Sequence, residues 1–289
     1  MQNAGMAALG LDWRYLACSV RPEELGAAIE GARAMRFLGL NLTVPHKLLA
    51  VAMVDALDES ARMWGAVNTI RFEAQDDRGE WRPLGDFQDV PTGPVRAHGF
   101  NTDADAISRS LREDLALEPT EARVLLLGAG GAGRTAALKL ASEGTAALYL
   151  VNRTESKAAD LAREISERFP KQSVSVGYPL SGPVDLVLNA TSLGLGTNDG
   201  MPFDPDRFDL RRAAAVYDMI YRPSETPLLR AARAAGCRVA NGLGMLLYQG
   251  ARALELWSGQ KAPTGVMRRA LELNVYGFDS YARSGKLEP

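Results

Sequence analysis

The sequence predicts an α/β protein of two domains, on the strength of three observations. The chain has 289 residues, which is enough for two domains of ~100–200 residues each. Apolar runs alternate with helix-forming stretches, which is typical of parallel βαβ units. One such run, at 123–127, leads directly into a glycine-rich turn and then into a helix-forming segment. We therefore expect an N-terminal α/β domain over 1–104, completed by helices at 241–289, and a doubly wound domain over 105–240.

The first domain begins with elements that can be read from local pattern. Residues 3–9 are helix-forming, and 14–20 have the composition of a strand. Pro22 with two acidic residues after it opens the next helix, and a short buried strand then leads into 39–43. Residues 72–99 are charged and rich in turn residues, which predicts a surface hairpin or loop excursion. We interpret this excursion as a passive insertion, with a functional lid as the alternative.

The second domain shows a regular alternation of strands and helices. The predicted strands are 123–127, 147–151, 173–178, 184–189 and 214–218. Helices fall between them, notably at 131–142 and 156–168. From residue 242 onward the sequence predicts a long helix through 257 and another at 264–275, which we expect to pack back on the first domain.

Composition and charge exclude several classes of function. Hydrophobic residues make up 46% and charged residues 24%, as in ordinary globular domains. The formal net charge of -2 offers no general attraction to nucleic acid or to a membrane. No apolar run approaches the ~18 residues of a membrane span, and no signal-peptide pattern is present. The two cysteines, Cys18 and Cys237, are expected to be packing residues in a reducing cytoplasm, and two histidines are too few for a metal cluster.

The glycine-rich turn predicts a dinucleotide-binding domain. Gly128, Gly130 and Gly133 have the G-x-G-x-x-G spacing, with a buried strand before them and a helix after them. The first glycine permits the tight turn, the second lets the backbone approach a pyrophosphate, and the third lets the helix pack close to the strand. The helix N-terminus then offers free N–H groups to the phosphates. We therefore expect the domain over 105–240 to be of the Rossmann type.

The end of the next strand indicates which dinucleotide is bound. An NAD-binding domain usually carries Asp or Glu there, which accepts a hydrogen bond from the ribose 2′-OH. Here 152–154 read Asn-Arg-Thr, and Lys157 follows one turn later. A carboxylate would repel a 2′-phosphate, whereas a guanidinium holds it in bidentate fashion and a hydroxyl donates to it. We predict NADP(H), with a solvated basic helix start as the alternative.

Polar side chains follow three apolar segments of the first domain, within 39–47, 65–69 and 99–103. Sheets of α/β proteins bind their ligands at such strand ends. Hydride transfer between an alcohol and a ketone requires a group that takes or supplies the hydroxyl proton, and a lysine near a carboxylate can do this. By chemistry alone, an exposed surface lysine would be the simpler interpretation of Lys47.

The motifs of the chain resemble those of the shikimate dehydrogenase family, in the same order and over nearly the whole length. They are GLNLTVPHK at 39–47, GAVNT at 65–69, NTD at 101–103, GAGGAG at 128–133, NRT at 152–154, NATSLG at 189–194, DMIYRP at 218–223 and GLGMLLYQ at 242–249. This resemblance implies the reversible, NADPH-dependent reduction of 3-dehydroshikimate to shikimate in the route to chorismate and the aromatic amino acids.

The resemblance also implies roles for individual residues. Lys47 would be the acid/base group, and Asp103 would be its partner and bind a substrate hydroxyl. The remaining substrate-binding residues would be Thr43, Asn68, Tyr221 and Gln249. The implied cofactor-binding residues are Glu59, Gly128, Ala129, Gly130, Gly131, Ala132, Asn152, Arg153, Thr154, Lys157, Thr191, Met219 and Gly242. A polyhydroxy substrate fits such a set, because it needs many directional donors and acceptors.

One departure from the family concerns the N-terminus. The family normally begins with a strand and a Ser-x-Ser pair that grips the substrate carboxylate, whereas residues 1–5 resemble the helix that follows this pair. We expect a translation start placed too far downstream, with a true truncation as the alternative. Without the serines, quinate/shikimate and aminoshikimate dehydrogenases stay open as rival activities, and a non-catalytic family member is a further alternative. The expected partners are a small-molecule substrate and NADP, in a monomer or a homodimer, without nucleic acid or membrane.

Overall fold

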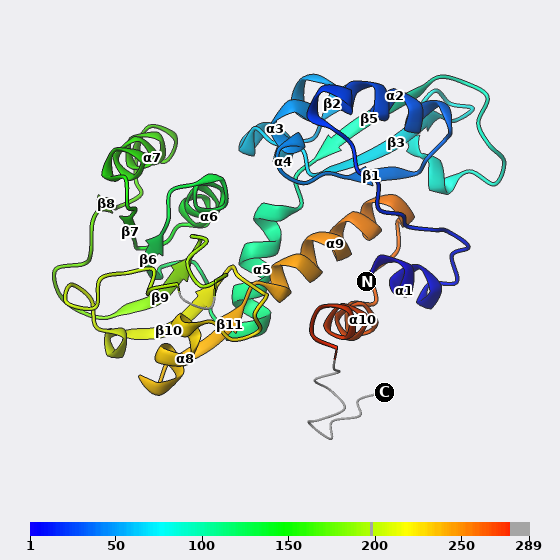
Figure 1. Ribbon diagram of the computed structural model, residues 1–289. Helices are drawn as coiled ribbons and strands as arrows, with labels where there is room; N and C mark the ends of the chain where they lie inside the picture. Colours follow the sequence, from blue (N-terminus) through cyan, green and yellow to red (C-terminus); the bar gives the residue numbers. More distant parts are fainter. Residues whose placement is uncertain (197–198, 278–289) are drawn as a thin grey trace. The chain divides into compact units, whose positions relative to one another are not determined.

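The computed structural model describes residues 1–196 and 199–277, and the chain divides into two compact units (Figure 1). The first unit comprises Met1–Asp103 and the chain from Leu247 onward, and the second comprises Ala104–Leu246. Each unit has its own sheet and its own hydrophobic core. Within the described residues, no helix is long and apolar enough to cross a membrane.

The first unit is built on a five-stranded mixed sheet. Its strands are β1 (Gly39–Asn41), β2 (Ala56–Leu57), β3 (Thr69–Gln75), β4 (Trp81–Pro83) and β5 (Val95–Phe100). The order is β1-β3-β5-β2, and β4 pairs with β3 beyond the end of β1. β1, β4 and β5 run antiparallel to β3, whereas β2 is parallel to β5.

The helices of the first unit are mostly short. They are α1 (Gln2–Ala8), η1 (Pro22–Glu24), α2 (Leu25–Ala34), α3 (His46–Leu49), η2 (Ala50–Ala52), α4 (Glu59–Trp64), η3 (Leu84–Asp86) and α10 (Thr264–Tyr276). A further helix, α9 (Leu243–Ser258), begins in the second unit and ends in the first. The predicted helices at the start and at the end of the chain therefore form, each within one or two residues of its predicted bounds.

The core of the first unit lies between α2 and one face of β3. Leu25, Ile29 and Ala32 recur at helical spacing and form one buried stripe on α2. Ile70 and Phe72 alternate along β3 and point to the same side, with 0% exposure each. Burial of each large apolar side chain stabilises the fold by roughly 1.5–3 kcal/mol.

The opposite face of β3 carries a buried charge cluster around Glu73, whose exposed fraction is 0%. The Glu73 carboxylate accepts hydrogen bonds from Arg71 Nε at 2.8 Å and Arg96 Nε at 2.7 Å, and it lies 3.0 Å from His98 Nδ1. Burial would raise the pKa of Glu73, but the bonds from His98, Arg71 and Arg96 outweigh it and lower the pKa to about 2. The carboxylate therefore stays ionised and holds β3 and β5 together.

Two expectations for the first unit are wrong. Residues 14–20 form no strand, because 11–21 have no ladder partner and are held instead by side-chain bonds. Tyr15 illustrates this: its N–H donates to Asn3 Oδ1, and its hydroxyl donates to Asn41 Oδ1. The excursion predicted at 72–99 is also too long. Its two ends belong to the central strands β3 and β5. The predicted hairpin is present, because β4 pairs with β3, so only the segments between these strands leave the sheet.

The second unit has a six-stranded parallel sheet in the order β11-β10-β9-β6-β7-β8. Its strands are β6 (Arg123–Leu127), β7 (Ala147–Val151), β8 (Val174–Val176), β9 (Val184–Asn189), β10 (Ala213–Asp218) and β11 (Arg238–Asn241). Its helices are α5 (Asp103–Leu115), α6 (Gly131–Ser142), α7 (Glu155–Arg168), η4 (Leu210–Arg212) and α8 (Pro227–Ala234). The chain leaves β6 toward β7 and returns on its other side as β9, so the strand order reverses between β6 and β9. Ligands of such sheets bind at this reversal.

The predicted fold class is confirmed, with a mixed α/β unit and a Rossmann-type doubly wound unit. The bounds of β6, β7, β9 and α6 agree with the sequence prediction residue for residue. β8 is shorter than predicted, whereas β10 and α7 begin one residue earlier. Local pattern was sufficient here because each of these elements is long, regular and buried on at least one face.

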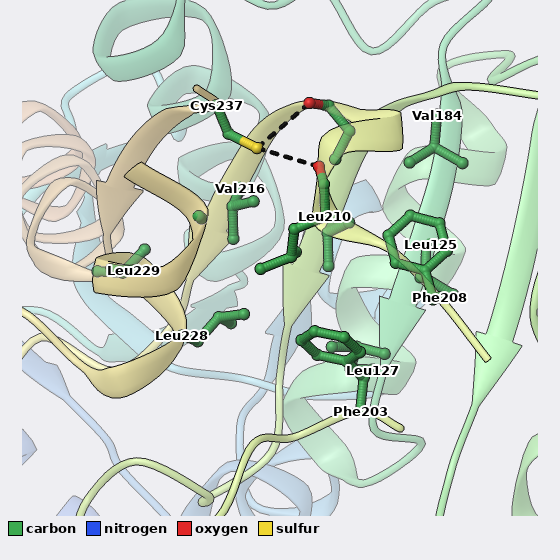
Figure 2. Close-up of a cluster of buried hydrophobic side chains, with 13 residues drawn as sticks. Leu125, Leu127, Val184, Phe203, Phe208, Leu210, Val216, Leu228, Leu229 and Cys237 are labelled. Carbon is green, nitrogen blue, oxygen red and sulfur yellow. Dashed lines mark hydrogen bonds between the residues drawn. The ribbon is translucent and has the colours of Figure 1, made fainter. Parts of the chain in front are cut away.

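Part of the core of the second unit packs around Cys237 (Figure 2). Figure 2 shows the Cys237 sulfur pointing toward two backbone carbonyls, those of Leu210 and Ala213, each 3.3 Å away. Burial raises the pKa of the Cys237 thiol, so the sulfur behaves as a small packing group. The packing role expected for Cys237 is confirmed, whereas Cys18 is exposed and does not belong to a core.

Candidate active site

In the first unit, two of the predicted residues form a hydrogen-bonded ion pair. Lys47 lies on the short helix α3, and Asp103 is the first residue of α5, directly after the segment that follows β5. Lys47 Nζ donates to Asp103 Oδ2 at 2.8 Å. The side chains are 27% and 13% exposed, so the pair is sheltered but open to a ligand.

Asn68 is hydrogen-bonded to Thr102, the residue before Asp103, and is 1% exposed. Its Oδ1 accepts from the N–H of Thr102 at 2.8 Å and from Thr69 Oγ1 at 3.2 Å. Its Nδ2 donates to Thr102 Oγ1 at 3.0 Å. A side-chain amide has two N–H donors, so within the described structure one remains for a ligand. The Thr102 backbone connects Asn68 directly to Asp103.

Thr102 and Thr69 are functional neighbours that the sequence prediction missed. Both are buried, at 2% and 0% exposure, and both fix the amide of Asn68. The signal was present, because Thr102 lies inside the NTD motif and Thr69 directly follows Asn68. Only the interatomic distances show that these two hydroxyls form hydrogen bonds with the Asn68 amide.

The other residues expected to contact substrate are divided between the two units. Thr43 is exposed in the turn after β1, where its carbonyl accepts from the N–H of His46. Gln249 is half-buried on the part of α9 that belongs to the first unit. Tyr221 follows β10 in the second unit and is 38% exposed. Glu59, expected near the cofactor, is the exposed first residue of α4 in the first unit.

In the second unit, the glycine turn has the geometry that a dinucleotide-binding loop requires. Gly128 has a φ of +103°, in the left-handed region that favours glycine. A Cβ on Gly133 would lie 2.0 Å from the Gly128 carbonyl oxygen, so only glycine permits this approach of α6 to the turn. A Cβ on Gly130 or Gly131 would meet nothing within 4 Å, so this side of the turn is open for a ligand. The separate roles predicted for the first and third glycines agree with this geometry.

This open side belongs to a cavity of about 330 Å³ at the carboxyl ends of β6, β7 and β9. Its walls are Gly128, Gly130, Val151, Asn152, Arg153, Thr154, Lys157, Ala190, Thr191, Ser192, Leu193 and Pro202. Seven of the predicted cofactor-binding residues therefore line one cavity, and Gly131 begins the adjoining helix α6. The N-terminus of α6 supplies free N–H groups and a partial positive charge beside it.

One end of the cavity is basic. Arg153 and Lys157 are exposed, and neither has an ion-pair partner in the part of the chain that the structure describes. Asn152 is used differently, because its Oδ1 accepts from the N–H of Ala129 at 3.0 Å and its Nδ2 donates to the Thr154 carbonyl at 2.8 Å. Asn152 thus ties the glycine turn to the basic loop and leaves the two cations free for an anionic group.

Met219 and Gly242 follow β10 and β11 and lie against each other. A Cβ on Gly242 would lie 2.0 Å from the Met219 carbonyl oxygen, so glycine is required for this contact. The Gly242 N–H also donates to the Ile220 carbonyl at 3.2 Å. The structure thereby joins two predicted cofactor contacts that are distant in sequence. No cluster of His, Cys, Asp and Glu suited to a metal ion is found among the described residues.

Comparison with known proteins identifies the family. The model of the shikimate dehydrogenase substrate binding domain matches residues 1–70, that of shikimate / quinate 5-dehydrogenase matches 111–193, and that of the shikimate 5'-dehydrogenase C-terminal domain matches 242–272. The chain is 39% identical over 277 residues to the shikimate dehydrogenase (NADP(+)) of Geobacter metallireducens, covering 93% of this chain and 89% of the relative.

Solved structures give the same result. A crystal structure of a shikimate dehydrogenase in complex with NADP⁺ matches with a TM-score of 0.78 and 33% identity, over 94% of this chain and 89% of the other. The ligand-free 5-ketofructose reductase of Gluconobacter sp. matches with a TM-score of 0.77 and 33% identity, over 95% and 92% of the two chains. The chain belongs to the shikimate dehydrogenase family.

Proposed function

We propose that this chain is an NADP-dependent shikimate dehydrogenase, which interconverts shikimate and 3-dehydroshikimate in aromatic biosynthesis. The observation that carries the proposal is the 2.8 Å hydrogen bond between Lys47 Nζ and Asp103 Oδ2, in a chain of this family. A dehydrogenase of this kind needs a proton-transfer group next to an alcohol, and a cavity for a phosphorylated dinucleotide. The first unit supplies the proton-transfer group, Lys47, and the second unit supplies the cavity.

Lys47 is the group that we assign to proton transfer. In the oxidation direction the O–H bond of the substrate breaks, and the neutral amine of Lys47 takes the proton. In the reduction direction the Lys47 ammonium returns this proton to the oxygen of the new alcohol. NADP(H), when bound, accepts or supplies the hydride. Asp103 orients the amine through Oδ2, and its carboxylate can accept a hydrogen bond from a second substrate hydroxyl.

The remaining substrate contacts follow from donor and acceptor chemistry. The unused N–H of Asn68 can donate to a substrate oxygen, and the exposed hydroxyl of Thr43 can donate or accept. We assign the side chains of Tyr221 and Gln249 to further substrate oxygens. Each such bond favours a polyhydroxy acid, because an analogue that lacks the matching group leaves a buried polar atom unpaired.

The cofactor contacts divide by the chemistry of NADP(H). Residues 128–132 form the open turn beside the cavity, and we assign the free N–H groups at the N-terminus of α6, including that of Ala132, to the pyrophosphate, while the Ala129 N–H already donates to Asn152 Oδ1. We assign the 2′-phosphate to Arg153, Thr154 and Lys157. Thr191, Met219 and Gly242 would lie toward the nicotinamide, and the assignment of Glu59 to the cofactor rests on the family resemblance alone.

The test is replacement of the proton-transfer group. Lys47→Ala and Lys47→Arg are both expected to lower kcat by about 100- to 10 000-fold, because neither variant places an amine beside Asp103 that can take or return the substrate proton. NADP⁺ binding, measured by titration calorimetry, is expected to stay at the wild-type value. Turnover near wild type in Lys47→Arg would show that only positive charge is needed, and would overturn the role of Lys47.

A second activity is favoured by one observation. The 5-ketofructose reductase matches with the same identity as the NADP⁺-bound shikimate dehydrogenase, so the scaffold also serves another polyhydroxy ketone. Comparing kcat/KM for shikimate, for quinate and for the reduction of 5-ketofructose separates the candidates. A clear preference for shikimate is expected, and a higher value for either rival would reassign the substrate.

We also infer a reducing, cytoplasmic setting, which the two free cysteines suit, and we leave monomer and homodimer as alternatives.

A further inference from the structure

Two polar side chains at the carboxyl ends of β9 and β10, and a third at the N-cap of α8, are completely buried. Asn189, Asp218 and Thr226 are each 0% exposed, and none of them lines the cofactor cavity. A buried carboxyl group is costly unless its oxygens accept hydrogen bonds. The surroundings of Asp218 therefore indicate what this carboxyl group does for the fold.

Three groups donate hydrogen bonds to the Asp218 carboxylate. Oδ1 accepts from Asn189 Nδ2 at 2.9 Å and from the Ile220 N–H at 3.1 Å, and Oδ2 accepts from Thr226 Oγ1 at 2.6 Å. Burial raises the pKa of Asp218, and the bonds from Thr226, Ile220 and Asn189 offset this in part. Asp218 thus joins the loop after β9 to the loop after β10.

The bond to Asp218 fixes which way the Asn189 amide points. With Nδ2 held by Asp218, Asn189 Oδ1 faces Thr191 and accepts from its N–H at 3.0 Å and from its hydroxyl at 2.8 Å. Thr191 Oγ1 then accepts from the Leu193 N–H at 3.1 Å. If the amide turned over, its N–H group would face the Thr191 N–H, and that bond would be lost.

The chain of hydrogen bonds ends in the cofactor cavity. Residues 190–193 form a wall of that cavity, and Ala190 and Thr191 lie beside Gly128 of the glycine turn. We propose that Asp218 is a positioning residue of the cofactor site, which fixes the Asn189 amide and thereby holds Thr191 and this wall in place for NADP(H). The proposal rests on the proposed function only for the identity of the ligand.

Asp218→Ala tests the proposal in the full-length chain, with NADP⁺ as the probe. The expected result is a rise of about tenfold in the Kd for NADP⁺ by titration calorimetry, because the Asn189 amide then no longer holds Thr191 in place. The KM for NADP⁺ should rise in parallel, while the KM for shikimate stays at the wild-type value. Asp218→Asn keeps an acceptor for Asn189 and Ile220 and should restore most of the affinity. Asn189→Leu breaks the same link from its other end and should raise the Kd as Asp218→Ala does, which keeps the test decisive if Asp218→Ala fails to fold.

Thr226→Val is the matched control. Thr226 caps α8 by accepting from the Leu229 N–H and donates to Asp218 Oδ2, but it makes no bond to Asn189, so this variant should lower the melting temperature and raise the Kd for NADP⁺ much less than Asp218→Ala does. A wild-type Kd in both Asp218→Ala and Asn189→Leu would overturn the positioning role, as would an equal rise in Thr226→Val. A wild-type chain that does not bind NADP⁺ would instead refute the proposed function.

Discussion

Replacing Arg153 with alanine removes a guanidinium from the basic end of the cofactor cavity. Neither this side chain nor Lys157 has an ion-pair partner in the described structure, so neither must break an internal bond to bind a phosphate. A hydrogen bond to a charged group is worth about 1.5–3 kcal/mol. Both side chains are exposed, so we take the lower end, which corresponds to about a tenfold effect.

We expect Arg153→Ala to lower kcat/KM for NADP⁺ by about tenfold and to leave the value for NAD⁺ unchanged. Arg153→Ala with Lys157→Ala should lower the NADP⁺ value by up to about 100-fold, if the two cations act independently. The assay is the initial rate with each cofactor at saturating shikimate, at low and high salt. The NADP⁺ preference of the wild type should weaken as salt rises, because exposed charges are screened.

Lys171→Ala provides the control for charge alone. Lys171 is an exposed cation of the same unit that does not line the cavity, so its removal should leave the cofactor preference unchanged. An equal loss with NAD⁺ and NADP⁺ in Arg153→Ala would mean that the guanidinium does not distinguish the 2′-phosphate. An unchanged preference in the double variant would refute the assignment of this end of the cavity.

Two further predictions concern the folded state. Gly133→Ala would place a Cβ 2.0 Å from the Gly128 carbonyl oxygen, so it should lower the free energy of unfolding by about 1–3 kcal/mol and abolish NADP⁺ binding. Gly131→Ala, with open space around its Cβ, should fold normally and only weaken NADP⁺ binding. Chemical denaturation and calorimetry distinguish the two variants, and equal stability of both would contradict the packing argument. Folding lowers the pKa of Glu73 from 4.5 to about 2, so the ionised carboxylate stabilises the folded state fully above pH 4.5, and this contribution is lost as the pH falls through 2. The difference in free energy of unfolding between wild type and Glu73→Gln, measured by urea denaturation, should therefore shrink by about 3 kcal/mol between pH 6 and pH 2. A difference that does not change with pH would contradict this prediction.

Much of the second unit could be predicted because its signals are local. The apolar run of β6, the glycine turn and the start of α6 follow one another directly in the sequence, and each residue type has one dominant structural reason to be there. The basic residues of the cofactor cavity were also found, because they lie at a fixed point after the next strand. The network of Asp218 was missed, because nothing in the DMIYRP motif shows that its carboxyl group is buried against Asn189.

The first unit was predicted less well because its signals depend on pairing between distant segments. Residues 14–20 have strand composition, but a strand needs a partner in register, and none pairs with them among the described residues. Phe72 was placed in an excursion because charged residues follow it closely, although it lies in the central strand β3 with 0% exposure. Composition decides whether a segment can form a strand, whereas neighbours decide whether it does.

The sequence by itself determined the glycine turn, the alternation of buried strands with helices, and the presence of a lysine, an aspartate and an asparagine in polar strand-end motifs. These features depend on backbone sterics and on the period of apolar residues, which act over a few neighbouring positions. The family resemblance implied that Asp103 is the partner of Lys47, but only the tertiary structure gave their 2.8 Å hydrogen bond across 56 residues of sequence and showed that Thr102 fixes Asn68. Such pairs form because the strand ends of one sheet converge. Local sequence patterns cannot predict which distant side chains the sheet brings within hydrogen-bonding distance of each other.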